Sequence, residues 1–510
     1  MAAQQSPKTV VFGLDGACFH LLNRWLDAGE LPAIGSLLDD GVSGDLEAVL
    51  PPVTSPNWKA YATGKNPGKL GIFWWFNVDT DAQETYVPTD RYHAETEFWE
   101  IMAEEDGAQV GVIGVPNTHP PTPLDGFVVS GAPDGENEGF THPPSLEAEL
   151  RERFDYRVVS QHHRQERSAE AYEEMLELVD QRFEAAAHLL ESPDYDVSFL
   201  QVTTYYLNNL HHSIWDDEYT LKAWKIVDDH VASFRDRAEN VVLMSDHGMA
   251  EIETVFRINQ WLQREGYLAT DASTAELLHR LGVRSDPLKV LLDRANKEVP
   301  GIDLKDAVSR ALPAWFVDNL PNDDGELTIG THDRLRWDES EVIASGLGPV
   351  YLNVDRDDPR YEDLREELVR RLEGLTDPQG RLVADGVYRG EEIYDGPYVE
   401  EGPDLVVDQT RGTYISQGYG RADVFSDSYH RWEAVNDSVG FFAAAGPDFA
   451  EGTVEDLGIL DLAPTLLHLH GCAVPSDMDG TVRTDLFDEA SEANRREVTY
   501  ENEDRPMPSP

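Results

Sequence analysis

Residues 8–16, KTVVFGLDG, form the stretch from which the fold can be argued. The apolar run predicts a buried β-strand that ends where Asp15 and Gly16 follow. Helical patterns separate this strand from later runs of the same kind, at 109–114, 126–130, 197–203 and 240–245. Strands that alternate with helices favour a mainly parallel sheet covered by helices on both faces, so we expect an α/β fold.

The clearest helix pattern runs from 168 to 191, where apolar residues recur at steps of three or four and make one stripe. Ser192 and Pro193 then end the helix. Toward the C-terminus, 440–445 predicts a last core strand, and 461–471 predicts a helix that stops at a glycine.

One segment, residues 255–345, lies between the early predicted strands and the later ones. We interpret 255–345 as an inserted cap or lid, because it stands between the early strands and the strand-like runs at 348–354 and 404–407. The final residues are polar and contain proline, which is typical of a frayed end. We therefore expect a core first part at 1–254, a cap at 255–345, a core second part at 346–486 and a flexible acidic tail at 487–510.

The charge of the chain is extreme. Lys and Arg number 41 and Asp and Glu number 97, which gives a formal net charge of −56 spread over every segment. Such a coat suits a cytosol of molar salt, where the Debye length falls to ~3 Å and self-repulsion is screened. We hypothesise a halophile that accumulates salt; the alternative is an ordinary acidic protein. Because the surface repels polyanions, we expect neither nucleic acid nor membrane lipid as a partner.

Cysteine content and apolar runs bear on the compartment. Cys18 and Cys472 are the only cysteines, so there is no disulfide framework and no CxxC metal site. The N-terminal residues lack a basic segment followed by a long apolar one, and no stretch approaches 18 uninterrupted apolar residues. We expect a cytoplasmic protein without a membrane span.

Polar residues follow two of the predicted strands. Asp15 follows the first strand, and Asp246 and His247 follow the strand at 240–245. Ligands bind at the carboxyl ends of strands in open α/β sheets, and carboxylate and imidazole groups are good metal ligands. The alternative for Asp15 is that its side chain caps a following helix.

A candidate nucleophile lies at the start of a predicted helix, in the segment Thr54-Ser55-Pro56-Asn57. Thr54 is either a helix N-cap or a nucleophile whose pKa a metal lowers, and Ser55 is the rival nucleophile. The start of a helix also favours a phosphate group. His212 and His430 are single histidines, which taken alone are more often structural than functional.

Together these segments resemble the type I phosphodiesterase and nucleotide pyrophosphatase family of the alkaline phosphatase superfamily, in its prokaryotic cytosolic form. The motifs are GLDGA at 13–17, TSPNWKAYATGKNPGKLGIF at 54–73, NNLHHSIW at 208–215 and SDHGM at 245–249. The resemblance implies an alkaline-phosphatase-like sandwich, with a central mainly parallel sheet flanked by helices and an inserted cap.

The resemblance also implies roles for single residues. Thr54 matches a nucleophile that is transiently phosphorylated, and Asn57 matches an asparagine that holds a phosphoryl oxygen. Two groups of residues match the ligands of two metal ions. The first group, which also uses the Thr54 oxygen, is Asp15, Asp246 and His247, and the second is Asn208, His212 and His430. Where the family has aspartate four residues before the histidine, this chain has Asn208, whose neutral oxygen binds cations more weakly.

These roles predict a hydrolase that uses two divalent ions, Zn²⁺ or else Mn²⁺, on a small phosphorylated substrate such as a nucleotide or phosphodiester. Asn208 motivates one alternative, a weakened or non-catalytic metal- or phosphate-binding protein on the same fold. The other alternative is a related phosphomonoesterase, phosphomutase or sulfatase. A sulfatase is disfavoured because residues 54–58 lack the arginine of its C/S-x-P-x-R motif.

Overall fold

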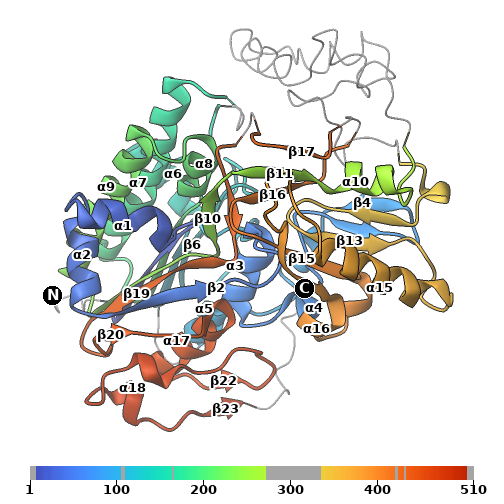
Figure 1. Cartoon of the computed structure of the whole chain (residues 1–510). Helices are drawn as coiled ribbons and strands as arrows, with labels where there is room; N and C mark the ends of the chain where they lie inside the picture. The colour runs from blue at the N-terminus through green and yellow to red at the C-terminus, as the bar shows by residue number, and fades with distance from the viewer. Residues whose placement is uncertain are drawn as a thin grey trace.

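The computed structural model describes residues 7–104, 109–162, 166–270, 335–419, 423–429 and 432–501 (Figure 1). Its largest element is a ten-stranded mixed sheet whose central strands β9, β1, β8, β5 and β6 are parallel neighbours. In spatial order the strands are β20 (Gly452–Thr453), β2 (Val42–Glu47), β19 (Val439–Ala445), β9 (Asn240–Met244), β1 (Thr9–Leu14), β8 (Val197–Thr204), β5 (Gln109–Ile113), β6 (Gly126–Val129) and β7 (Thr141–His142), with β21 (Leu457–Gly458) beside β2.

Strand β1 forms because all six of its residues are buried and their side chains alternate between the two faces of the sheet. Phe12 and Leu14 join the core on one face, and Val11 joins the core on the other. The expected strand is thus confirmed, with both faces covered as in other sheets with parallel centres.

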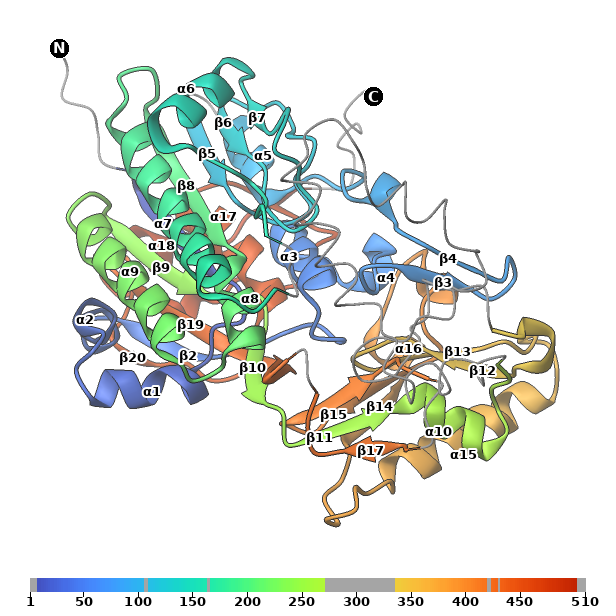
Figure 2. The same ribbon diagram turned by 90° about the horizontal axis from the view of Figure 1, so that it is seen from above.

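Helices cover both faces of the sheet (Figures 1 and 2). The longest is α7, where the Ser168 side chain accepts a hydrogen bond from the Ala171 backbone and so begins the helix as predicted. One face packs against α1 (Phe19–Asp27), α2 (Pro32–Asp39), α6 (Ser145–Phe154), α7 (Ala169–Glu191), α8 (Tyr206–Ser213) and α9 (Glu218–Arg235). The other packs against α3 (Thr54–Thr63), α5 (Phe98–Glu104) and α17 (Leu462–His470).

Two smaller sheets lie beside the central one and share a separate hydrophobic core. Figure 2 shows them with their helices as a second lobe. The runs 348–354 and 404–407, which we expected in the second part of the core, pair with each other here and not with the central sheet. The strands are β16 (Thr413–Ser416), β11 (Thr254–Arg257) and β17 (Phe425–Ser426), then β12 (Val342–Ala344), β13 (Pro349–Leu352), β15 (Leu405–Gln409) and β14 (Ala384–Arg389), with α10 (Ile258–Glu265), α15 (Arg360–Glu373) and α16 (Gly390–Ile393).

Other short elements are α4 (Pro67–Leu70), the hairpin β3 (Asn77–Asp79) and β4 (Glu84–Tyr86), and the pair β10 (Gly248–Glu251) and β18 (Ala434–Asp437). Most of the expected cap, residues 271–334, lies outside the described residues, and the division of the chain into domains stays a prediction.

The C-terminal segment differs from the frayed tail that we expected at 487–510. Phe487 and Ala493 are buried in the core beside α17. Strand β23 (Tyr500–Glu501) pairs with β22 (Val474–Pro475) after the short helix α18 (Glu492–Arg495). Residues up to 501 are therefore packed onto the molecule, and 502–510 lie outside the described part.

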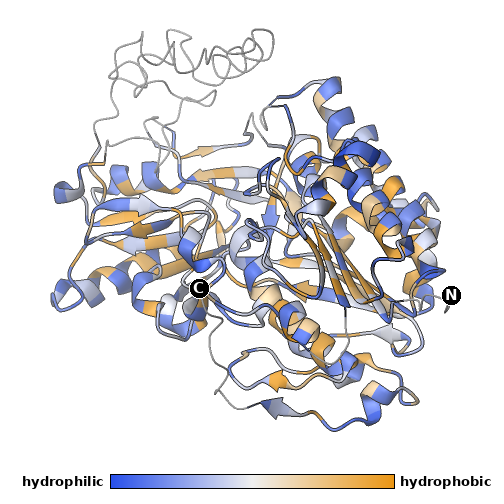
Figure 3. Ribbon diagram, turned by 180° about the vertical axis from the view of Figure 1, so that it is seen from behind, coloured by the Kyte–Doolittle hydropathy of each residue, from blue (hydrophilic) through white to orange (hydrophobic). Residues whose placement is uncertain are grey.

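The hydropathy of the residues follows the layered arrangement of the central sheet and its helices. In Figure 3 the strands of the central sheet are largely orange, and the helices around them carry blue residues. Within the described residues, no helix is both long enough and apolar enough to cross a membrane.

Candidate active site

Side chains from three neighbouring strand ends meet at one edge of the central sheet. Asp15 follows β1, the pair Asp246 and His247 follows β9, and Asn208 lies in α8, directly after β8. The turn after β1 requires glycine, because Gly16 has a φ of +71° and an added Cβ would lie 2.9 Å from the Met249 sulfur. The strand order thus explains how residues far apart in sequence converge.

Asp15, Asp246 and His247 form a cluster with metal-ligand spacing. One ligand atom from each lies within 4.8 Å of the others, and all three residues are fully buried. The His247 Nδ1–H donates to the Gly248 carbonyl at 2.9 Å, which leaves Nε2 as the nitrogen with a lone pair. That Nε2 lies 3.2 Å from Asp246 Oδ2 and 3.7 Å from Asp15 Oδ1.

Burial changes the pKa of each member of the cluster. It raises the pKa of Asp15 to about 7, although hydrogen bonds from Trp58 and Asn208 oppose the change. Burial and the neighbouring Asp15 charge raise the pKa of Asp246. Burial also lowers the pKa of His247 to about 3, so its imidazole is neutral, as a metal ligand must be.

The cluster fits a cation. Asp246 Oδ2 is buried and accepts no hydrogen bond from the described residues. The two carboxylates therefore lie close together in a dry interior, and the hydrogen bonds that Asp15 accepts from Trp58 and Asn208 leave this Asp246 oxygen without a donor. The arrangement is costly unless a cation or proton is shared. Oxygen and imidazole ligands suit Zn²⁺ and Mn²⁺.

Thr54 is the first residue of α3, and its side chain faces the cluster. The N-cap residue is Val53, and the helix has no side-chain cap, so Thr54 does not act as one. Its Oγ1 lies 3.2 Å from His247 Nε2. The rival nucleophile Ser55 is held elsewhere, because its Oγ accepts a hydrogen bond from Asn117 Nδ2 at 3.0 Å.

Asn57 lies one turn further along α3, and its amide is occupied by the backbone. Its Oδ1 accepts from the Val49 N–H at 2.8 Å, and its Nδ2 donates to the carbonyls of Val49, Pro51 and Val53 at 3.0–3.1 Å. These bonds fix the loop that leads into α3. The expected contact between Asn57 and a phosphoryl oxygen stays a prediction, and it would require some of these bonds to break.

The expected second group of metal ligands is described in part. Asn208 and His212 lie four residues apart on α8, so their side chains share a helix face. Asn208 Nδ2 lies 2.6 Å from Asp15 Oδ1, and His212 Nδ1 donates to the Ala434 carbonyl at 2.8 Å. The His212 ring stacks on Trp432 at a centroid distance of 4.2 Å. His430 lies outside the described residues.

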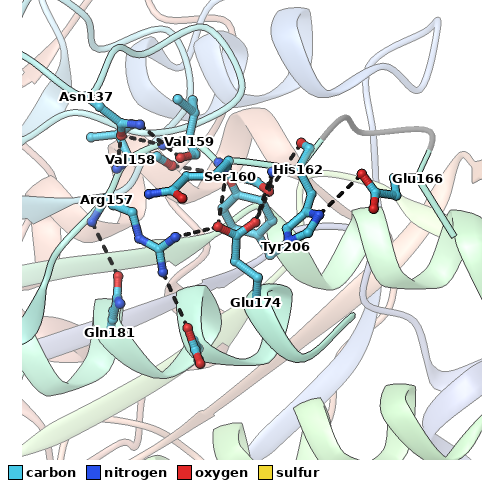
Figure 4. Close-up of polar contacts among 12 residues, drawn as sticks. Asn137, Arg157, Val158, Val159, Ser160, His162, Glu166, Glu174, Gln181 and Tyr206 are labelled. Atoms are coloured by element: carbon cyan, nitrogen blue, oxygen red, sulfur yellow. Dashed lines mark hydrogen bonds and ion pairs between the residues drawn. The ribbon is translucent and has the colours of Figure 1, made fainter. Parts of the chain in front are cut away.

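A hydrogen-bonded loop fixes the start of α8 (Figure 4). Tyr206, the first residue of α8, accepts a hydrogen bond from Ser160 N at 2.8 Å and donates to the Val158 carbonyl at 3.2 Å. Glu174 of α7 faces the same loop and accepts from the His162 backbone at 3.2 Å and from the Ser160 hydroxyl. The helix that carries Asn208 is therefore tied to α7 through this loop.

Sequence reasoning missed two residues that contact the site. Trp58 Nε1 donates to Asp15 Oδ2 at 2.9 Å. Asn436 of β18 lies with its Nδ2 3.0 Å from His247 Nε2 and donates to the Pro52 carbonyl at 2.7 Å. Trp58 lies four residues after Thr54 on α3, which was a usable signal; for Asn436, only the β10–β18 pairing brings it near.

The family model for type I phosphodiesterase/nucleotide pyrophosphatase matches residues 9–434. Among solved structures, phosphonoacetate hydrolase from Sinorhizobium meliloti 1021, in complex with phosphonoformate or phosphonoacetate, is 15% identical, with a TM-score of 0.54 over 90% of this chain and 95% of the hydrolase. Murine ectonucleotide pyrophosphatase/phosphodiesterase 5 is 14% identical, with a TM-score of 0.48 over 94% of this chain and 100% of the murine chain. No curated protein matches.

The similarity to the bacterial hydrolase confirms the expected fold, a central mostly parallel sheet flanked by helices. At 15% identity it adds nothing about the substrate. The family model is more informative because it spans the segments that supply Asp15, Thr54 and Asp246. The chain therefore belongs to the type I phosphodiesterase/nucleotide pyrophosphatase family, whose members are hydrolases of the alkaline phosphatase superfamily.

Proposed function

We propose that this chain hydrolyses small phosphoric esters with bound divalent cations and through a phosphorylated Thr54. One observation carries the proposal: Thr54 Oγ1 lies 3.2 Å from His247 Nε2, beside the cluster of Asp15, Asp246 and His247. Divalent cations on these residues would lower the pKa of a hydroxyl and offset charge on phosphoryl oxygens. Nucleotides and other phosphodiesters are the proposed substrates.

The proposed reaction has two steps, in which Thr54 first attacks the substrate phosphorus and water then cleaves the intermediate. The Thr54 hydroxyl gives up its proton to solvent and the bond from Oγ1 to phosphorus forms while the bond to the leaving oxygen breaks. That oxygen departs with the electron pair and takes a proton from water. Water then attacks the phosphorus held on Thr54 and the bond to Oγ1 breaks, which releases the remaining phosphomonoester of a diester substrate and restores the hydroxyl. Thr54 is only 3% exposed, and the positive end of the α3 dipole lies at its backbone, so bulk water is limited and negative charge is favoured there.

We propose two cations, Zn²⁺ first and Mn²⁺ as the alternative. Asp15, Asp246, His247 and Thr54 would bind one. Asn208, His212 and His430 would bind the other. Asn208 is 2% exposed and its Oδ1 has no hydrogen-bond partner among the described residues, so this oxygen is available as a neutral ligand. The Ala434 carbonyl accepts from His212 Nδ1, which orients the ring with Nε2 as the ligand atom.

The net charge of −56 supports a high-salt cytoplasm as the working compartment. The same charge disfavours polyanionic substrates, so small phosphodiesters are preferred over nucleic acid polymers in this proposal.

The test is hydrolysis of bis-p-nitrophenyl phosphate and a nucleotide diester, in molar KCl with Zn²⁺ or Mn²⁺. Thr54→Ala should lower turnover by at least roughly 10³-fold, because the attacking oxygen is removed. Ser55→Ala is the matched control and should keep most activity, since the Ser55 hydroxyl is bound by Asn117.

Three outcomes would oppose the proposal. Wild-type turnover in Thr54→Ala would exclude Thr54 as the nucleophile, and loss of turnover in Ser55→Ala alone would assign that role to Ser55. Metal-loaded wild type that hydrolyses neither a phosphodiester nor a phosphomonoester would favour the non-catalytic alternative.

A further inference from the structure

The amide of Asn208 touches the proposed nucleophile with its donor end. Asn208 is 2% exposed, and its Nδ2 lies 2.6 Å from Asp15 Oδ1 and 3.3 Å from Thr54 Oγ1. The two N–H groups of the amide account for these two contacts. Its Oδ1, at the other end, has no hydrogen-bond partner among the described residues.

An aspartate at position 208 could not make the hydrogen bonds that the Asn208 amide donates. An ionised aspartate only accepts hydrogen bonds, so it could donate neither to Asp15 nor to Thr54. At the 2.6 Å separation that Asn208 adopts, two carboxylates would repel unless a proton or cation lay between them. The asparagine therefore gives this site a hydrogen-bond donor that an aspartate would not supply.

We propose that Asn208 is a catalytic residue that donates a hydrogen bond to a phosphoryl oxygen during attack by Thr54; this inference rests on the proposed function. The non-bridging oxygens surround the phosphorus that bonds to Thr54 Oγ1, so a donor 3.3 Å from Oγ1 is within reach of one of them. The long contact with a neutral hydroxyl is exchanged for a charge-assisted hydrogen bond, which is shorter and stronger.

Other buried amides near Thr54 are bound elsewhere. The Asn57 Nδ2 group donates to three backbone carbonyls of residues 49–53. The Asn436 Nδ2 group lies between His247 and the Pro52 carbonyl. Among the described residues, Asn208 is the asparagine whose side chain contacts the Thr54 hydroxyl.

The experiment compares wild type with Asn208→Asp and Asn209→Asp, all loaded with Zn²⁺. Asn209 is the next residue of α8, and its substitution adds the same charge at a side chain that makes no hydrogen bond with Thr54 or Asp15 among the described residues. Elemental analysis gives the metal content, and calorimetry gives the affinity for inorganic phosphate and orthovanadate. Orthovanadate mimics the transition state, in which the new hydrogen bond should be strongest.

We expect Asn208→Asp to bind at least as much metal as wild type, since a carboxylate is the better cation ligand. Its affinity for phosphate should fall by roughly tenfold to a hundredfold, as expected for loss of a hydrogen bond to a charged group. The affinity for orthovanadate should fall further. Asn209→Asp should match wild type in all three measurements.

Equal or tighter binding of orthovanadate by Asn208→Asp would overturn the inference, because Asn208 would then serve only as a cation ligand. Metal-loaded wild type that binds neither anion would also overturn it. If Asn208→Asp does not fold, Asn208→Ala removes the donor without adding charge and carries the same expectation. Absence of turnover in a wild type that binds orthovanadate would instead count against the proposed function alone.

Discussion

At the scale of single residues, Trp58 is one of two side chains that orient the proposed metal ligand Asp15. Its indole N–H donates to Asp15 Oδ2 at 2.9 Å, and the whole side chain is buried. Hydrogen bonds of this kind fix the direction of a ligand and are a large part of a metal site's affinity.

Trp58→Phe removes that N–H and keeps an aromatic ring in the core. We expect the affinity for Zn²⁺ to fall by about tenfold to a hundredfold, because Asp15 loses one of the two side-chain donors that orient it. Competition with a chelating dye measures the affinity directly and needs no turnover.

Trp99→Phe is the matched control. The Trp99 indole also donates to a buried carboxylate, Glu97 Oε2 at 2.8 Å, but it lies on α5 and outside the cation cluster. Equal losses of affinity in both variants would mean that the effect reflects general damage to the core and not the contact with Asp15.

The same contacts mark the limit of prediction from the sequence. Asp15, Asp246 and His247 could be predicted to converge because each directly follows a strand, and parallel strands end at one edge. Asn436 could not, since its contact depends on how β18 packs beside the site; for Trp58 the only signal was its place four residues after Thr54 on α3. The family resemblance implied a role at the phosphate for Asn57, which stays a prediction; the hydrogen bonds of its amide to the loop at 49–53 were not predictable from the sequence.

At the scale of elements, the strands and helices with a strong apolar period were predictable. Strands β1, β8 and β9 and helix α7 lie within one or two residues of their expected bounds. Periodicity does not specify the partner of a strand, so 348–354 and 404–407 were expected in the core although they build a separate sheet. Distant pairing is set by tertiary packing, which a single local pattern does not encode.

Helix α5 carries a carboxyl group that burial makes sensitive to pH. Burial and the charge of Glu97 raise the pKa of Glu100 to about 7, against an ordinary value of 4.5, while Lys59 pairs with Glu97. The folded state therefore binds the Glu100 proton more tightly than the unfolded state. Stability from this group is present at low pH and is lost as the pH rises from 4.5 through 7.

Glu100→Gln should remove the loss of stability that accompanies ionisation of Glu100 as the pH rises. At pH 8 we expect the variant to be more stable than wild type by about 1–2 kcal/mol, a value reduced because Glu100 is only partly buried. Near pH 4.5 the two should be equal. Chemical denaturation across that range measures the difference, and Glu104→Gln, at an exposed site of the same helix, is the control. A constant difference at every pH would contradict the titration of Glu100.

At the scale of the whole molecule, charge dominates the surface. The chain carries a net charge of −56, and the exposed large apolar side chains among the described residues are Val87, Leu382, Tyr388 and Tyr500. Self-repulsion of this size opposes a compact state unless counter-ions screen it. We therefore expect the stability of the whole fold of this hydrolase, and not only its active site, to depend on the salt concentration.

Stability should rise steeply with KCl. At low ionic strength the Debye length is near 30 Å and acidic side chains repel across the molecule; in molar salt it falls to ~3 Å and only near neighbours interact. We expect the melting temperature of the metal-loaded protein to rise by on the order of 10 °C between about 0.1 and 2 M KCl. Differential scanning calorimetry measures this, and sorbitol at matched osmolality separates screening from solute exclusion. A melting temperature that is independent of KCl, or equally raised by sorbitol, would show that repulsion between carboxylates does not limit this fold, and the high-salt cytoplasm would lose its support.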